Sequence, residues 1–227
     1  MAKKFDLHVH SNYSKDSINS IDKLIQKYSK LKFDGFAITD HGDMNALPKA
    51  RAYAKEKNIE IEIIGGCEFL SDKGEVLGLC IEEMINEKEF GPLCDAIHDQ
   101  GGFAVLPHPF DSLRGHACNP TLLPPELLKL IDGIETLNAH CLYPSFNQKA
   151  SQYALQHSLL STAGSDAHFL FECGAAFTEI PENMQIEISL RRKKTIPKGK
   201  ILPFYVHGPP KLTAWAKKLG IIQKPSP

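Results

Sequence analysis

The 227-residue sequence lacks several features that would assign it to a special class of protein. No stretch approaches 18 consecutive apolar residues, and residues 1–8 contain no apolar signal core, so neither a membrane-spanning helix nor a secretory signal is expected. The six cysteines are widely spaced without a Cys-x-x-Cys pair, which argues against a zinc knuckle or a redox centre. The expected location is therefore the cytoplasm, with reduced cysteines acting as small apolar side chains.

An excess of one charge is also missing. The formal net charge is -1, with 42% hydrophobic and 23% charged residues, which is typical of a globular protein without a general attraction to nucleic acid or to membranes. Basic residues do gather in residues 191–200, where six of ten are Lys or Arg. Such a run could bind a polyanionic backbone, but no aromatic residues are interleaved for stacking, so a solvated surface is the simpler interpretation.

Short apolar runs alternate with helical patterns, which predicts repeated strand-helix units around a largely parallel sheet. Strands are expected at residues 5–9, 35–39, 59–64, 76–81, 103–106, 133–137 and 159–163. Helices are expected after Ser20, and at residues 46–57, 90–97 and 146–154. From about residue 180 the alternation stops, so the rest of the chain is expected to be an appendage.

Histidines and acidic residues fall at the carboxyl ends of these predicted strands, the edge at which parallel α/β folds place their ligand sites. His8 and His10 lie two residues apart in the first strand, so they point to one face and can share a cation. Four later strand ends supply further imidazoles or carboxylates, at Asp40, His41, Glu68, His108, Asp166 and His168. A lone His-x-His is usually a chance pair, but five such strand ends in succession indicate a metal centre.

The ligand types narrow the choice of metal. Nitrogen and oxygen ligands without thiolate suit zinc, manganese or iron better than calcium, which prefers oxygen throughout. The sequence leaves the identity of the metal open.

Together these motifs resemble the polymerase-and-histidinol-phosphatase, or PHP, domain of metal-dependent phosphoesterases. The matching segments occur in family order within residues 1–180: Asp6-Leu-His-Val-His10-Ser-Asn-Tyr-Ser-Lys-Asp16, Ile38-Thr-Asp-His41, Gly66-Cys-Glu68, Pro107-His108-Pro109 and Gly164-Ser-Asp166-Ala-His168. The resemblance implies an α/β fold, a distorted TIM-like (β/α)7 barrel with its metal site at the carboxyl end of the strands. Residues 1–180 would form this catalytic barrel, and residues 181–227 a basic extension packed on it or trailing from it.

The resemblance also implies a ligand set for two or three divalent ions. One ion would be held by His8, His10, Glu68 and Asp166. Glu68 would bridge to a second ion that His108 also binds, and a third would be held by Asp16, His41 and His168. Asp16 stands where family members have either Asp or His, so it is competent as a ligand.

Two positions have open roles. Many relatives have a histidine where Glu75 stands, so Glu75 is an alternative ligand, a catalytic carboxylate or a surface residue at a hairpin. His140 follows a predicted strand and is the candidate for completing the shell of the second ion, with a substrate contact as the alternative.

The implied reaction is hydrolysis of a phosphate mono- or diester by a metal-bound hydroxide. Arg114 is the candidate for binding the phosphoryl oxygens, because guanidinium pairs bidentately with phosphate, although a solvated loop arginine is an equal alternative. His116 is a further candidate substrate contact, with a surface role as its alternative. The expected partner is a small phosphorylated molecule, such as a nucleotide or histidinol phosphate, or a nucleic-acid end; no membrane partner is expected.

Two other functions remain open. An amidohydrolase-like barrel also begins with His-x-His, but usually uses a bridging lysine and a final lone aspartate, whereas this sequence offers Glu68 and the Asp166-x-His168 pair. A catalytically silent, metal-stabilised scaffold is the other alternative, against which the near-complete ligand set argues.

Overall fold

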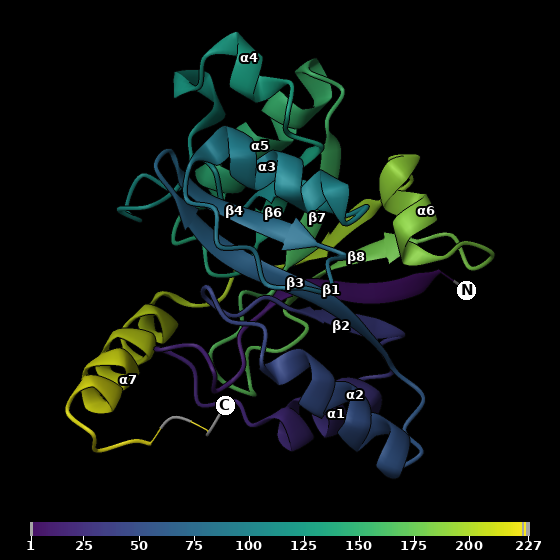
Figure 1. The fold of residues 1–227 in the computed structure, drawn as a ribbon, viewed down its shortest axis with the longest axis vertical. Helices are drawn as coiled ribbons and strands as arrows, with labels where there is room; N and C mark the ends of the chain where they lie inside the picture. Colours follow the sequence, from purple (N-terminus) through teal and green to yellow (C-terminus); the bar gives the residue numbers. More distant parts are fainter. Residues whose placement is uncertain (1, 224, 226–227) are drawn as a thin grey trace.

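The structure is a computed structural model that describes residues 2–223 and residue 225 (Figure 1). All seven predicted strands are present, as β1 (Lys3–Val9), β2 (Gly35–Ile38), β3 (Glu62–Ser71), β4 (Gly74–Leu79), β5 (Phe103–Leu106), β6 (Gly133–Asn138) and β7 (Leu160–Gly164). Two further strands follow, β8 (Ala176–Ile180) and β9 (Ile196–Gly199). The nine strands form one sheet in the order β7-β6-β5-β4-β3-β2-β1-β8-β9.

The helices cover the outside of this sheet. The four predicted helices correspond to α1 (Ile21–Lys30), α2 (Ala46–Glu56), α3 (Phe90–Asp99) and α5 (Pro144–Gln156). Three further helices, α4 (Pro125–Leu128), α6 (Ile186–Arg191) and α7 (Pro209–Lys218), complete the set, with 3-10 turns η1 (Pro120–Leu122) and η2 (Phe204–His207). In α1, Leu24, Ile25 and Tyr28 share the helical face that is buried against the sheet.

The sheet is less parallel than the sequence predicts. β4 runs antiparallel to both β3 and β5, and β8 runs antiparallel to both β1 and β9. β3 continues through Glu68 to Ser71 because the short turn before Gly74 returns the chain as a hairpin. Glu68 therefore lies within a paired strand rather than at a strand end.

The sheet curves into a nearly closed barrel. The first half of β1 pairs with β8, with Phe5 opposite Thr178. The second half meets the chain that follows β7, where Asp166 N donates to His8 O at 2.8 Å and His10 N donates to Ala167 O at 3.1 Å. The fold is thus the expected distorted TIM-like barrel, and the two ends of the sheet meet beside His8.

The segment after residue 180 is joined to the barrel. β9 pairs with β8 along Ile196–Gly199, so it extends the same sheet. The boundary at residue 180 stays a prediction. None of the helices in residues 2–223 is long and apolar enough to span a membrane.

Candidate metal centre

His8 and His10 project from β1 toward one point inside the barrel mouth. Their Nε2 atoms are 3.2 Å apart, and both side chains are fully buried. The Nδ1 atom of His8 donates to Glu135 Oε1 at 3.2 Å, and that of His10 donates at 3.1 Å to Ser14 Oγ, which itself donates to Asp40. With both Nδ1 protons used, the facing Nε2 atoms need a positive charge at or between them.

Glu68 and Asp166 surround this pair with negative charge. Asp166 Oδ1 lies 3.1 Å from His10 Nε2 and 3.5 Å from His8 Nε2. Glu68 Oε2 lies 3.4 Å from His10 Nε2 and 3.5 Å from His8 Nε2. Two imidazole nitrogens and two carboxylate oxygens therefore converge as the family ligand set predicts.

Glu68 also faces a second group of side chains. Its Oε1 lies 3.2 Å from His108 Nε2, and Glu75 Oε2 lies 3.8 Å from the same nitrogen. Glu75 is close enough to His41 and Glu68 for the three to share an ion. The two oxygens of Glu68 thus face different neighbours, which is the arrangement that a bridging ligand requires.

A third group of possible ligands lies beside the His10 ring, which stacks on the ring of His41. Asp16 Oδ2 is 3.3 Å from His41 Nε2 and 3.5 Å from His168 Nε2. His168 Nδ1 donates to the main-chain oxygen of Asp166 at 2.7 Å, which turns its Nε2 toward Asp16. Asp16, His41 and His168 are therefore together, as predicted.

His140 lies apart from the second group. Its Nε2 is 3.3 Å from Glu172 Oε2, and its ring is 5.4 Å from that of His168. Glu172 is fully buried and accepts hydrogen bonds from the backbone nitrogens of His168 and Phe169. His140 is thus grouped with His168 and Glu172, not with Glu68 and His108.

The electrostatics of the centre favour bound cations. Burial would raise the pKa of Glu68, but His41 and His8 hold it well below its usual value. Burial would lower the pKa of His8, yet Asp166, Glu135 and Glu68 hold it well above its usual value. Burial and the neighbouring His41 and His168 lower the pKa of His10 to about 3. So much buried negative charge around the Nε2 atoms attracts a proton or, more strongly, a divalent ion.

An orphaned polar atom supports the same conclusion. Among the described residues, Asp16 Oδ1, in the third ligand group, is buried without a hydrogen-bond partner. Buried polar atoms of this kind are rare in folded proteins unless water or an ion satisfies them. The nitrogen and oxygen donors present fit zinc, manganese or iron.

The backbone is strained at two of these positions. His108, held between Pro107 and Pro109, has φ +32°, and Asp166 has φ +55°. Non-glycine residues seldom adopt such values, and they cluster where geometry serves a site. The rigid mounting that the two prolines predict for His108 is thus a turn that aims its Nε2 at Glu68.

Arg114 and His116 flank the centre differently. Arg114 Nη2 is 2.6 Å from Asp166 Oδ2, so the guanidinium stands directly beside the ligand group. His116 is exposed, and its main-chain oxygen accepts from Glu75 N at 2.8 Å. Arg114 lines a cavity of about 500 Å³ together with Asp16, His140 and His168, whereas His116 lines one of about 300 Å³ with Glu68 and Glu75.

Three buried residues support the centre without being among the ligands or substrate contacts expected from the sequence, where Asp40 was noted only as a strand-end carboxylate. Glu135 orients His8, Asp40 acts on His10 through Ser14, and Glu172 contacts His140. A signal existed for Glu135 and Asp40, because each is a charge within or directly after a buried apolar strand. Glu172 follows no predicted strand, so only the three-dimensional contact identifies it.

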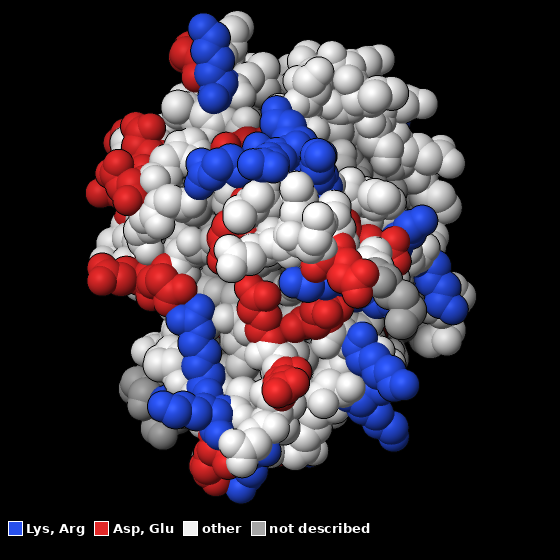
Figure 2. All heavy atoms as spheres, turned by 90° about the vertical axis from the view of Figure 1, so that its right-hand side faces the viewer, with Lys and Arg blue, Asp and Glu red and all other residues white. Residues whose placement is uncertain are grey.

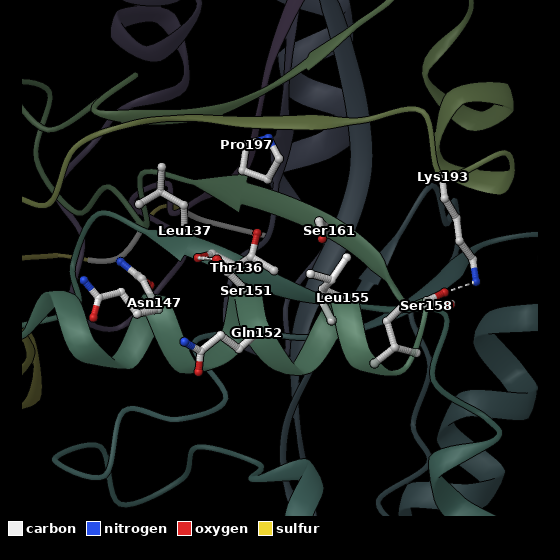
Figure 3. A pocket seen from close by; sticks show the side chains of 13 residues that line it. Thr136, Leu137, Asn147, Ser151, Gln152, Leu155, Ser158, Ser161, Lys193 and Pro197 are labelled. Atoms are coloured by element: carbon white, nitrogen blue, oxygen red, sulfur yellow. Dashed lines mark hydrogen bonds between the residues drawn. The ribbon is translucent and has the colours of Figure 1, made fainter.

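A further groove lies away from this centre. It measures about 930 Å³ and runs between α5 and Pro197 on the outside of the barrel (Figure 3). Hydroxyl and amide groups line it, and its one cation among the described residues, Lys193, donates to Ser158 O. The groove offers no cluster of ionisable groups for catalysis.

The basic run also lies away from the centre. Arg191 contacts Gly101 O just before β5, and Lys193 contacts Ser158 O just before β7, so both lie at the amino ends of strands whose carboxyl ends carry the ligands. Figure 2 shows the α6 side of the molecule, where basic and acidic side chains are interspersed. Arg191 and Lys193 therefore lie away from the barrel mouth, and no residue of 191–200 is among those that line the two cavities beside the centre.

The structure is an α/β barrel whose mouth brings together side chains that could hold metal ions. Comparison with known proteins gives the family: the PHP domain model matches residues 6–157, and a PHP-associated model matches residues 144–192. The chain belongs to the PHP domain family. An uncharacterized protein of Methanocaldococcus jannaschii is 34% identical over 182 residues, which cover 79% of this chain and 71% of that protein.

Solved structures share the fold. A two-domain protein of Bacteroides vulgatus, described as containing a predicted PHP-like metal-dependent phosphoesterase, has a TM-score of 0.72 at 20% identity. The match covers 88% of this chain and 65% of that one, so this chain spans less than two thirds of that protein. An amidohydrolase of Chromobacterium violaceum, solved with bound sulfate and no metal, has a TM-score of 0.65 at 16% identity and covers 85% of this chain and 97% of that one.

Proposed function

We propose that this protein hydrolyses a phosphate mono- or diester of a small molecule at a centre of two or three divalent ions. The observation that carries the proposal is Glu68, whose two carboxylate oxygens face His108 on one side and His8, His10 and His41 on the other. A carboxylate shared between imidazole groups in this way is suited to bridging two cations.

The ions would be held by three groups of residues. The first is His8, His10, Glu68 and Asp166, and the third is Asp16, His41 and His168. For the second we assign Glu75 beside Glu68 and His108, in preference to His140, because Glu75 faces His108 whereas His140 faces Glu172. At this position Glu75 would then supply a carboxylate ligand where many relatives have a histidine.

Bound divalent ions would neutralise the charge of the phosphate ester and lower the pKa of a coordinated water. The side chains of the protein perform the remaining tasks. Arg114 binds phosphoryl oxygens from beside Asp166, and the low-dielectric walls around it strengthen that attraction. Glu135 and Asp40 keep His8 and His10 in the tautomers that present Nε2 to the centre.

The cavities favour a small ester. The two beside the centre measure about 300 and 500 Å³, which is within the range for small-molecule pockets. A nucleotide or a sugar phosphate fits this size. A nucleic-acid end is the less favoured substrate because no residue of the basic run lines either of these cavities.

The two other functions have less support. Amidohydrolase-type sites usually use a bridging lysine, whereas here a carboxylate, Glu68, lies between His108 and the pair His8 and His10. A silent scaffold would need neither Arg114 beside the ligands nor cavities that open onto them.

The test is metal analysis followed by a phosphate-release screen of protein reconstituted with Mn, Zn or Fe. We expect turnover of nucleotides or other small phosphate esters but not of amides, and the variants His10→Ala and Asp166→Ala to lose at least 100-fold in rate while remaining folded. Rates that stay unchanged in both variants would reject the assigned centre. Cleavage of amides alone would favour the amidohydrolase alternative, and a folded, metal-loaded protein inactive on every ester would favour the scaffold.

A further inference from the structure

The C-terminal helix α7 contacts the mouth of the barrel. Figure 1 shows it beside the loop between β1 and α1, at the opposite side of the molecule from α6. Lys217 Nζ lies 2.8 Å from Asn12 O, 2.7 Å from Ser14 O and 2.6 Å from Ser17 O. An ammonium group has three donors, and here each meets a main-chain carbonyl of the same loop.

This loop carries Asp16, which belongs to the third ligand group. Elsewhere the loop is fixed by Ser17, whose Oγ lies 2.9 Å from His10 O and 3.0 Å from His168 O. Of the two carboxylate oxygens of Asp16, Oδ2 faces His41 and His168, whereas Oδ1 is buried without a hydrogen-bond partner among the described residues. The main chain on both sides of Asp16 is thus held by Lys217 from outside the barrel.

The same face of α7 forms part of the substrate pocket. Pro210 and Ala214 line the 500 Å³ cavity opposite Arg114, His140 and His168. Pro210, Ala214 and Lys217 are spaced four and three residues apart, so they lie on one face of the helix. Leu212, Trp215 and Leu219 occupy the opposite face and are more than half exposed.

The helix lies outside the segments that identify the family. The two matching family models end at residues 157 and 192, whereas α7 begins at Pro209. It therefore adds a wall to the pocket of this chain that the family match does not include.

We propose that α7 is a working part of the catalytic site: Lys217 is a positioning residue that holds the Asp16 loop in its ion-binding geometry, and Pro210 and Ala214 limit the size of the leaving alcohol. Only the claim about the leaving alcohol rests on the proposed function. The pocket combines the cation of Arg114 with the apolar side chains of Leu113, Leu142, Pro210 and Ala214. It fits a phosphate ester whose leaving group has a flat, apolar portion, such as an aryl alcohol or a nucleoside.

The first test replaces Lys217→Met, which keeps the length of the side chain and removes its donors. We expect one ion to bind about tenfold more weakly, measured by titration of metal-free protein with Mn or Zn against a chelator dye. Lys218→Met is the matched control, since Lys218 is exposed on the same turn. If Lys217→Met binds ions as tightly as Lys218→Met does, the positioning role of Lys217 is refuted. This holds even if Lys217→Met has a lower melting temperature, because Lys217 would then be a structural contact only.

The second test replaces Ala214→Trp, which fills the pocket from α7. We expect the ratio of kcat/KM for a small ester, glycerol phosphate, to that for a nucleoside monophosphate to rise at least tenfold. Leu212→Trp places the same indole side chain on the exposed face and should leave the ratio as it is. An unchanged ratio in Ala214→Trp would refute the proposal that α7 limits the size of the leaving alcohol. Because the ion titration needs no turnover, a protein inactive on all esters would refute the proposed function and leave the first test decisive.

Discussion

Glu135 is an example of how buried acids support the predicted ligands. Its carboxylate accepts from His8 Nδ1 at 3.2 Å, from His108 N at 3.0 Å and from Asn138 Nδ2 at 2.8 Å, and the residue is 1% exposed. The Glu135 side chain thereby fixes both the ring of His8 and the turn that carries His108. Such supporting partners normally strengthen metal binding.

Replacing Glu135→Gln should weaken ion binding about 10- to 100-fold, because an amide has one acceptor oxygen for three donors and no charge to stabilise the imidazole. The measurement is a competitive titration with a chelator dye. Glu126→Gln, at an exposed position of α4, is the control. Equal ion affinity in the two variants would contradict the role of Glu135.

The cysteines should be chemically inert in the folded protein. Burial raises the pKa of Cys94, Cys118 and Cys173 to about 12, so almost no thiolate exists at neutral pH. All six are free, and burial also raises the pKa of Cys67, Cys80 and Cys141. Ellman's reagent at pH 8 should label the native protein at least 100-fold more slowly than protein in guanidinium; a fast-reacting native thiol would refute this.

Individual ligands were predictable where a strand end carried them, because the apolar run before the residue fixes its position. His8, His108 and Asp166 are of this kind. The partner of His140 was not predictable, since Glu172 approaches it only after the chain has turned back past β7. Sequence spacing also could not decide between Glu75 and His140 for the second ion, because that choice depends on which side chain faces His108.

At the scale of elements, the sequence predicts β1 to β7 and the helices α1, α2, α3 and α5, but not β8, β9 or α7. Four consecutive residues of β9, Ile196–Gly199, include a proline and a glycine, which normally argue against a strand. The antiparallel direction of β4 was missed as well, because a buried strand has the same apolar pattern in either direction.

The junction of β7 with β1 allows no side chain at Gly164. A Cβ there would lie 2.3 Å from His8 Cβ and 2.8 Å from His8 N, neither of which can move without shifting β1. Gly164→Ala should therefore lower the free energy of unfolding by about 1–3 kcal/mol, measured by urea denaturation with chelator present. It should also weaken ion binding through His8.

Gly91→Ala is the control for this substitution. The nearest contact of its Cβ would be Leu127 Cδ2 at 3.7 Å, an ordinary van der Waals distance. Within α3 this change should stabilise the protein by up to about 1 kcal/mol. Equal stability of the two alanine variants would mean that β7 and β1 are less tightly joined than described.

For the whole molecule, removal of metal should lower stability, because buried carboxylates would then repel one another. With free ion about 1,000-fold above its Kd, binding contributes about 4 kcal/mol, and a protein of this size shifts by about 2–4 °C per kcal/mol. We expect EDTA to lower the melting temperature by about 8–16 °C in calorimetry and added Mn or Zn to restore it. A melting temperature insensitive to EDTA would argue against a structural contribution from the ions.

The closure of the barrel differs between its two ends. Near the mouth, β1 meets the backbone of Asp166 and Ala167 directly. Farther down, β8 pairs with β1, and side chains reach β7: Thr178 Oγ1 bridges to the amide and carbonyl of Ala163, and Thr195 Oγ1 donates to Ser161 O. Direct backbone hydrogen bonds between β1 and the chain that follows β7 therefore lie in the plane that holds the ligands. Thermal motion can therefore widen the barrel at the end away from the ligands while the distances between His8, His10 and Asp166 stay constant.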